Sequence, residues 1–401
     1  MISSAPQQKI AQRNRELPFT TSGTVLLHAD FLLTGIVMTF LGPMLPILSA
    51  RWSITDDKSG ALIFVQFFTS MFGMLLSSTL VRRFGYRITL MMGLAFMSCG
   101  MVLLGSGPYV AGIFSVGVLG FGYGTTTPAG NLRTAEIDPA SSAAALNVIN
   151  AVWGIGAMSS PFLLAIAQHA HRPTWFLDGT AGALILLLGV LAASRFNPDT
   201  RVVMAHLDQP VEKVWTSRIL PVICALFFIY VGTETSFGAW VATYAHRLSP
   251  NEHTLWAVVP SFYWGALLVG RSLAPFLLRS KSATTVALGG LGIALLGGIA
   301  LVSAHGTSVV VLGSVLAGLG LASIFPISVS LLPGWFGNSA RRASGPVFSS
   351  GNMGGALLPW IVGIVSKHSG SLRLGFFLPL AGVAAMLAFY SASFSAQNRA
   401  D

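Results

Sequence analysis

GFGYGTTTP at residues 120–128 and GLGLASIFP at residues 318–326 are two copies of one pattern. In each copy, a Gly-x-Gly pair is followed six residues later by a proline. The copies lie 198 residues apart, which is close to half of the 401-residue chain. A similarity at half the chain length indicates an internal repeat.

Other residues repeat in the same order. The matched pairs are Gly35 with Gly232, Phe40 with Phe237, Gly73 with Gly270, Arg82 with Arg279, Gly93 with Gly290, Gly156 with Gly354 and Pro161 with Pro359. Glycine allows close helix packing and proline allows kinks, so the pattern also serves packing. Two parallel halves would enclose a central cavity, which rocking of the halves exposes to each side in turn.

The composition points to lipid as the main solvent. Hydrophobic residues make up 53% of the chain and charged residues 9%, and the mean hydropathy is +0.71. A membrane-spanning helix needs about 20 apolar residues, and the sequence predicts twelve such spans in an all-α membrane protein. These spans are 23–49, 59–81, 88–106, 109–136, 142–169, 174–195, 218–245, 254–279, 284–304, 308–335, 343–367 and 372–394.

The basic residues predict the orientation of these spans. With both termini inside, 17 of the 23 Lys and Arg residues, including Arg271, fall in cytoplasmic segments, as expected for a multi-pass protein of the bacterial inner (plasma) membrane. The charge of +10 is therefore a topology signal and not a nucleic-acid interface. The predicted segments are a cytoplasmic tail (1–22), a six-helix bundle (23–195), a cytoplasmic linker (196–217), a second bundle (218–395) and a short tail (396–401).

The loop STLVRRFGYR, residues 78–87, resembles the loop signature of the major facilitator superfamily. Arg83, Gly85 and Arg87 match that signature and are the candidate gating motif, whereas Ser78 and Arg82 replace its glycine and aspartate. The resemblance implies the major facilitator fold and transport by alternating access.

A second resemblance is narrower. FFIYVGTETSFGAW at residues 227–240, together with Gly120, Gly122 and Asn131, is similar to the fucose, glucose and galactose symporters, a branch that includes the sodium-dependent glucose transporters. Threonines 125–127 stand where that branch usually has an acid. The resemblance implies a hexose as the solute.

Two acids in apolar helices are the candidate ion-coupling residues. Glu234 lies about 15 residues into its span and so, at 1.5 Å per residue, near the middle of the bilayer. Intramembrane acids are functional by default, although a permanently neutral Glu234 bonded to a neighbouring helix is the alternative. Asp30, two turns into the first span, is either a second coupling carboxylate or inner-gate residue, or a hydrated acid near the interface.

Sugars bind through hydroxyl partners and flat apolar faces, so amides and aromatic residues within the spans are the candidate substrate contacts. They are Gln66, Asn131, Asn147, Asn150, Trp153, Trp240, Tyr263, Trp264 and Asn352. Asn147, Asn150 and Trp153 follow helical spacing and share one face of their helix. The alternative is that single amides tie helices together.

The sequence contains no nucleotide-binding loop, metal-ligand spacing or nucleophile motif, so we expect neither an enzyme nor a cofactor or metal. The favoured hypothesis is a monomeric, cation-coupled transporter of a small polar solute, a hexose or other monosaccharide, with a proton as the coupling ion and sodium as the near alternative. The alternative hypothesis is a proton-coupled exporter of drugs or amphipathic metabolites.

Overall fold

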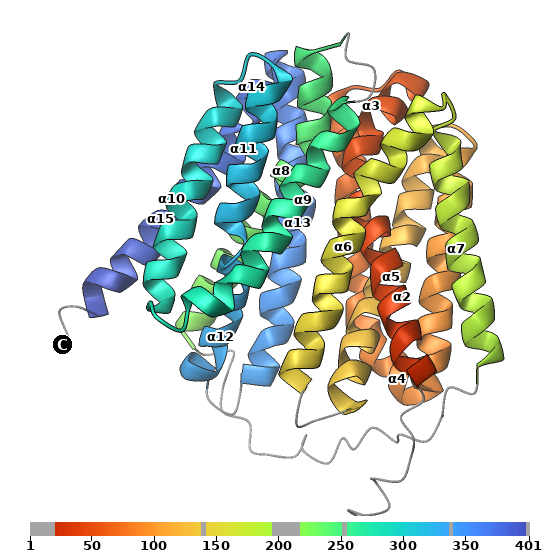
Figure 1. Ribbon diagram of the computed structural model, residues 1–401, viewed down its shortest axis with the longest axis horizontal. Helices are drawn as coiled ribbons and strands as arrows, with labels where there is room; N and C mark the ends of the chain where they lie inside the picture. Colours follow the sequence, from red (N-terminus) through yellow and green to blue (C-terminus); the bar gives the residue numbers. More distant parts are fainter. Residues whose placement is uncertain (1–20, 138–141, 195–216, 251–254, 337–339, 398–401) are drawn as a thin grey trace, which may run out of the picture.

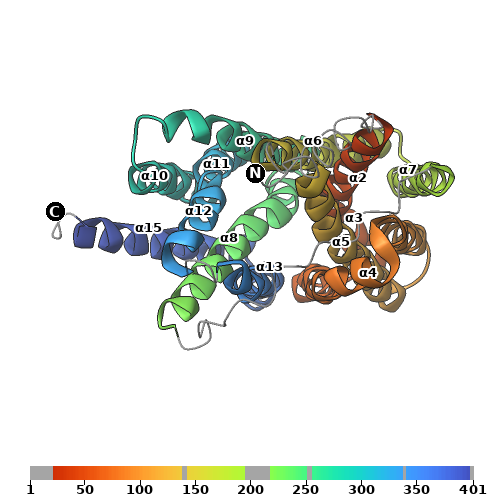
Figure 2. The same cartoon turned by 90° about the horizontal axis from the view of Figure 1, so that it is seen from below.

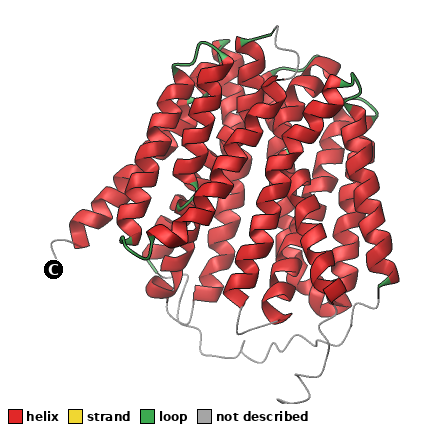
Figure 3. Ribbon diagram, in the orientation of Figure 1, coloured by secondary structure: helices red, strands yellow, loops and turns green. Residues whose placement is uncertain are grey.

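The computed structural model describes residues 21–137, 142–194, 217–250, 255–336 and 340–397. These residues form helices joined by short loops, with no strand among them (Figure 3). The helices gather into two groups that lie side by side, α2 to α7 and α8 to α15 (Figures 1 and 2). The predicted tails and the 196–217 linker lie almost wholly outside the described residues.

The first half contains six elements. They are α2 (Thr21–Thr39), α3 (Leu41–Trp52), α4 (Asp56–Gly105), α5 (Tyr109–Ile137), α6 (Ser142–His169) and α7 (Thr174–Ala193). The second half contains eight. They are α8 (Ile219–Leu248), α9 (Leu255–Leu277), α10 (Ala283–Val302), α11 (Thr307–Leu321), α12 (Ile324–Phe336), α13 (Ala340–Ser369), α14 (Leu372–Gly375) and α15 (Phe377–Gln397). We call the end where α7 stops and α8 starts the linker end.

Nine of the described helices are long and apolar enough to cross a membrane, and α2 with α3, which meet at 44°, make a tenth. Helix α4 contains two crossings, because its helical course is broken at Gly85. Helix α9, with 23 residues, is also long enough to cross a membrane. The described helices confirm the predicted all-α membrane fold class. Three predicted spans are broken helices: 23–49 corresponds to α2 and α3, 308–335 to α11 and α12, and 372–394 to α14 and α15.

The reversal within α4 depends on Gly85. Its φ of 81° lies in a region that side chains with a Cβ rarely adopt. Gly73 and Gly93, on the two legs of α4, both contact the 121–126 stretch of α5. In a straight helix these residues would be about 30 Å apart, so the two legs form a hairpin that holds α5 between them.

Glycine contacts show how closely the two halves resemble each other. A Cβ added to Gly120 of α5 would collide with the backbone carbonyl of Gln66, and one added to Gly318 of α11 with that of Tyr263. The helices α5 and α11 are therefore packed backbone to backbone against their neighbours in equivalent ways. The internal repeat seen in the sequence is thus a repeat of helix contacts.

Large apolar side chains cover the outside of the bundle. Val110, Leu186 and Phe114 are 76%, 70% and 66% exposed, respectively. Exposed apolar residues spread over many helices suit contact with acyl chains and not with water. The chain is therefore a multi-pass membrane protein.

Candidate functional site

A charged pair lies within the second half. Arg271 of α9 donates from Nη2 to Oε1 of Glu234 of α8 over 2.8 Å. The Glu234 side chain is 11% exposed and the Arg271 side chain 29%. The sequence indicated Glu234 as a coupling residue, whereas Arg271 was predicted to be one of the cytoplasmic charges. A basic residue inside a predicted span, with an acid in the preceding span, was the signal that could have revealed the pair.

Hydroxyl groups surround this pair. Tyr263, a predicted site residue, donates its hydroxyl to the backbone oxygen of Glu234 over 2.9 Å. Arg271 also donates to the hydroxyl of Tyr230 over 3.4 Å. Tyr123, on α5 of the first half, lies close enough to interact electrostatically with both Glu234 and Arg271. The pair therefore faces the seam between the halves.

Two tryptophans meet across this seam. The rings of Trp153 on α6 and Trp264 on α9 are 6.2 Å apart, edge to face at 87°. Trp264 also lies against Gly238, one turn beyond Glu234 in α8. Neither indole N–H makes a hydrogen bond of normal geometry within the described residues, although both nitrogens are buried. The Trp153 N–H lies within reach of the Tyr123 hydroxyl, whereas the Trp264 N–H has no acceptor among the described residues.

The four predicted asparagines contact different neighbours. Asn150 on α6 donates to Oδ1 of Asn131 on α5 over 3.3 Å, and Asn147 is exposed one turn away. Asn352 on α13 donates to the sulfur of Met74 on α4 over 3.2 Å, so it bridges the halves. All four amides are at least partly exposed.

Two predicted site residues are already engaged within the protein. Gln66 is 1% exposed and donates to the backbone oxygen of Val37 over 3.1 Å. Trp240 is fully buried and donates to the backbone oxygen of Pro359 over 2.9 Å. Both side chains tie neighbouring helices together, and this arrangement leaves no free donor on Trp240 for a solute.

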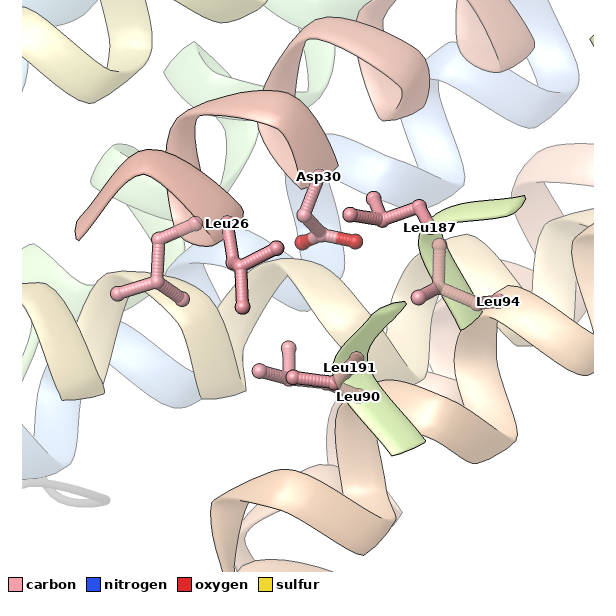
Figure 4. A pocket seen from close by; sticks show the side chains of 7 residues that line it. Leu26, Asp30, Leu90, Leu94, Leu187 and Leu191 are labelled. Atoms are coloured by element: carbon pink, nitrogen blue, oxygen red, sulfur yellow. The ribbon is translucent and has the colours of Figure 1, made fainter. Parts of the chain in front are cut away.

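Asp30 lies away from the seam. It is 3% exposed, and its carboxyl group points among leucines of α2, α4 and α7, all within the first half (Figure 4). The structure therefore does not place it beside Glu234 as a partner. Of the predicted gating motif, Gly85 forms the α4 reversal, Arg83 lies over the Phe84 ring, and Arg87 donates to the backbone oxygens of Leu191 and Ala192 in α7.

Charged residues join the halves at the end opposite the linker end. They were not predicted from the sequence. Arg247 of α8 contacts both carboxyl oxygens of Asp56 of α4, at 2.5 and 2.8 Å. Ser366 of α13 donates to the same carboxylate, and Lys367 donates to Asp57 over 2.8 Å. We call Asp56, Asp57, Arg247, Ser366 and Lys367 the end lock. These contacts hold the halves together at that end.

Two helical repeats, with a polar seam between them and a lock at one end, define a secondary transporter of the rocking type. The chain belongs to the Major Facilitator Superfamily, whose family model matches residues 31–311. This is a family of transporters and not of enzymes.

Relatives and solved structures extend the comparison. The glucose/mannose transporter GlcP of Bacillus subtilis is 24% identical over 375 residues, covering 90% of this chain and 92% of GlcP. A putative glucose/galactose transporter of Helicobacter pylori is 25% identical and covers 86% and 90%, respectively. The crystal structure of a mutant of the nucleoside transporter NupG superposes with a TM-score of 0.77 at 13% identity, covering 92% of this chain and 98% of NupG, which supports the fold.

Proposed function

We propose that the protein is a cation-coupled secondary transporter of hexoses that works by alternating access. The observation that carries the proposal is the group of side chains at the seam between the halves, where the Glu234–Arg271 pair, tyrosine hydroxyls and the two indole rings lie together. A sugar has hydroxyl groups that both donate and accept, and an apolar ring face that packs on indole. The relatives named for glucose, mannose and galactose support the same solute class.

The charged pair suits a coupling role. Glu234 has a guanidinium partner at 2.8 Å, so in this conformation the pair is charge-balanced. A proton or sodium ion that reached Glu234 would compete with Arg271 for the carboxylate. The released guanidinium could then donate to a solute hydroxyl. Cation binding and solute binding would thereby favour the same state.

The proposal includes the membrane, the orientation and the oligomeric state of the transporter. The excess of Lys and Arg in the predicted cytoplasmic segments supports cytoplasmic termini and a bacterial inner membrane. The end lock then lies on the outer side, and the conformation described here is closed to the outside. One chain contains both halves of the seam, so a monomer suffices for transport.

The test is counterflow of radiolabelled glucose, mannose, galactose and fucose in proteoliposomes. Counterflow requires no driving ion, so it examines the solute separately from the coupling. We expect exchange of at least one hexose by the native protein. In Glu234→Gln, we expect gradient-driven accumulation to be lost under imposed proton or sodium gradients.

Asp178→Asn is the matched control, since Asp178 is an exposed acid near one end of α7. It should behave as the native protein does. Absence of any hexose exchange by folded protein would refute the sugar assignment. Protection of cells from lipophilic cations would then favour the exporter hypothesis.

A further inference from the structure

Two hydrogen-bond donors beside the Glu234–Arg271 pair have no acceptor. The Nε of Arg271 and the indole nitrogen of Trp264 are buried and have no hydrogen-bond partner in the described part of the chain. Both residues belong to α9, seven residues apart, so they share one face of that helix and lie about 10 Å apart along it. Guanidinium and indole groups donate and never accept. A solute that binds here must therefore supply acceptors.

Arg271 has a single anionic partner. Glu234 is the only acid of the second half within the described residues. The described acids of the first half lie away from the pair: Asp30 among leucines, Glu136 close to Tyr86, Asp178 in α7, and Asp56 and Asp57 in the end lock. A proton that neutralised Glu234 would leave a largely buried guanidinium without a counter-charge, which is an unfavourable state.

No other charged side chain among the described residues faces the pair. The titratable groups next to it are Tyr230 of α8, Tyr263 of α9 and Tyr123 of α5, which are neutral at about pH 7. Basic side chains of α8 and of the surrounding helices lie toward helix ends: Arg51 of α3, Arg133 of α5, His169 of α6, His246 and Arg247 of α8, and Arg341, Arg342, Lys367 and His368 of α13. The counter-charge for Arg271 must then come from the solute.

We propose that the protein also transports hexuronates together with a proton. These sugar acids have a hexose ring and a carboxylate in place of the terminal hydroxymethyl group. The proton binds Glu234 and makes it neutral, and the solute carboxylate replaces Glu234 on Arg271. Nη2, which now binds Glu234, and the unpartnered Nε lie on one edge of the guanidinium, so both oxygens of a carboxylate can accept from it. The inference rests on the proposed function, because the solute occupies the same group of side chains at the seam.

Charge balance predicts how acidity changes the affinity. At low pH, Glu234 is protonated, and Arg271 is free to bind the solute. As the pH rises, Glu234 ionises, returns to Arg271 and repels the solute carboxylate. The solute itself stays ionised from about pH 5 to about pH 8, since carboxyl groups titrate at about 4. Hexuronate affinity should therefore fall as the pH rises, and by more than the affinity for an uncharged analogue.

Matched pairs of sugars test the charge separately from the ring. Glucuronate and galacturonate are compared with glucuronamide and galacturonamide, which keep the shape and lose the charge. Proteoliposomes report counterflow of each radiolabelled acid, and thermal stabilisation in detergent reports binding of all four compounds. At acidic pH, we expect exchange of at least one acid, bound about tenfold or more tightly than its amide. No exchange of either acid, or equal affinities for acid and amide, in folded native protein would overturn the proposal.

Variants of the pair assign the roles of its two members. Glu234→Gln imitates the protonated acid, so its preference for acid over amide should match that of the native protein at acidic pH and no longer vary with pH. Glu234→Gln/Arg271→Leu removes both charges, so neither is left buried alone, and the preference should disappear. Lys367→Gln is the matched control, because it removes a cation from the end lock, and it should keep the native preference.

Each variant can contradict its assignment. A preference that persists in the double variant would refute the role of Arg271, and one that still varies with pH in Glu234→Gln would refute that of Glu234. The comparison of acid and amide in the native protein decides the proposal even if the double variant does not fold.

Hexose counterflow separates this proposal from the hexose assignment. Exchange of hexoses without exchange of either acid would refute the hexuronate inference alone. Exchange of an acid without exchange of any hexose would refute the neutral solute and support the charged one. Absence of both in folded protein would refute both.

Discussion

The two halves of the molecule are alike where backbones touch and different where charges are buried. Gly122 of α5 approaches the carbonyl of Gly93, and Gly320 of α11 approaches that of Gly290, which is the equivalent contact in the other half. The buried acids have no such correspondence. Asp30 in the first half lies without a partner in the described part of the chain, whereas Glu234 in the second half is paired with Arg271.

This difference indicates that helix packing and ligand binding place different requirements on the two halves of a duplicated transporter. Helix packing must be equivalent in both halves for them to rock as similar bodies, so the glycine contacts are preserved. Ion and solute binding need one asymmetric site, so the charges differ. The most informative variants are those that remove a charge from one half, or a packing contact from both.

The largest effect is expected from Arg271→Leu. It leaves Glu234 buried without a cation, and breaking a buried pair by removing one partner costs about 3–5 kcal/mol. Thermal unfolding in detergent should show a strong loss of stability and yield. Adding Glu234→Gln to this variant removes the other charge and should restore much of the lost stability. Native stability in Arg271→Leu would indicate that the pair is not desolvated.

Gly120→Ala and Gly318→Ala test whether the halves pack equivalently. Each methyl group would meet a backbone carbonyl that cannot move aside, and overpacking costs about 1–3 kcal/mol. The two losses in unfolding temperature should be similar. Gly182→Ala on α7 and Gly292→Ala on α10 are the matched controls, because a Cβ there meets no atom within 4 Å. A loss in one half and none in the other would contradict the equivalence.

The fold could be predicted from sequence because it depends on signals that repeat. Apolar length fixes the crossings, and the Gly-x-Gly pairs mark where α5 and α11 touch their neighbours. The turn at residues 82–87 was also visible, since Gly85 lies between charged residues. The breaks within α2–α3, α11–α12 and α14–α15 were not visible, because the apolar composition continues through them.

The site was harder to predict, because a sequence shows that a polar group is buried but not what it contacts. Gln66 and Trp240 looked available, yet both donate to carbonyls of neighbouring helices. Arg271 was assigned to the cytoplasmic charges, since counting by segment cannot detect a partner 37 residues away. Asp30 resembled Glu234 in sequence and differs from it in having no cation beside it among the described residues.

Asp56→Asn should loosen the end lock with a moderate effect. The Arg247 side chain is 44% exposed, so the pair is worth about 1 kcal/mol or less. Because the pair joins the halves, its loss should shift the population toward the state open at that end. Labelling of a cysteine introduced at Trp360, which packs on Phe64 across the seam, should accelerate a few-fold. An unchanged rate in Asp56→Asn would indicate that apolar packing alone closes this end.

Lys367→Gln should show the smallest effect. Comparing it with Asp56→Asn distinguishes the contribution of the Lys367–Asp57 pair from that of the Arg247–Asp56 pair. Lys367 and Asp57 are 43% and 24% exposed, so water and salt screen their attraction to a few tenths of a kcal/mol. The labelling rate at position 360 should rise only slightly, and the rise should vanish at high salt. The effect of Asp56→Asn should persist in salt, because the Asp56 side chain is only 11% exposed and also accepts from Ser366. Equal salt sensitivity of the two variants would mean that both pairs act as surface charges, and closure would then depend on the helix contacts that the two halves share.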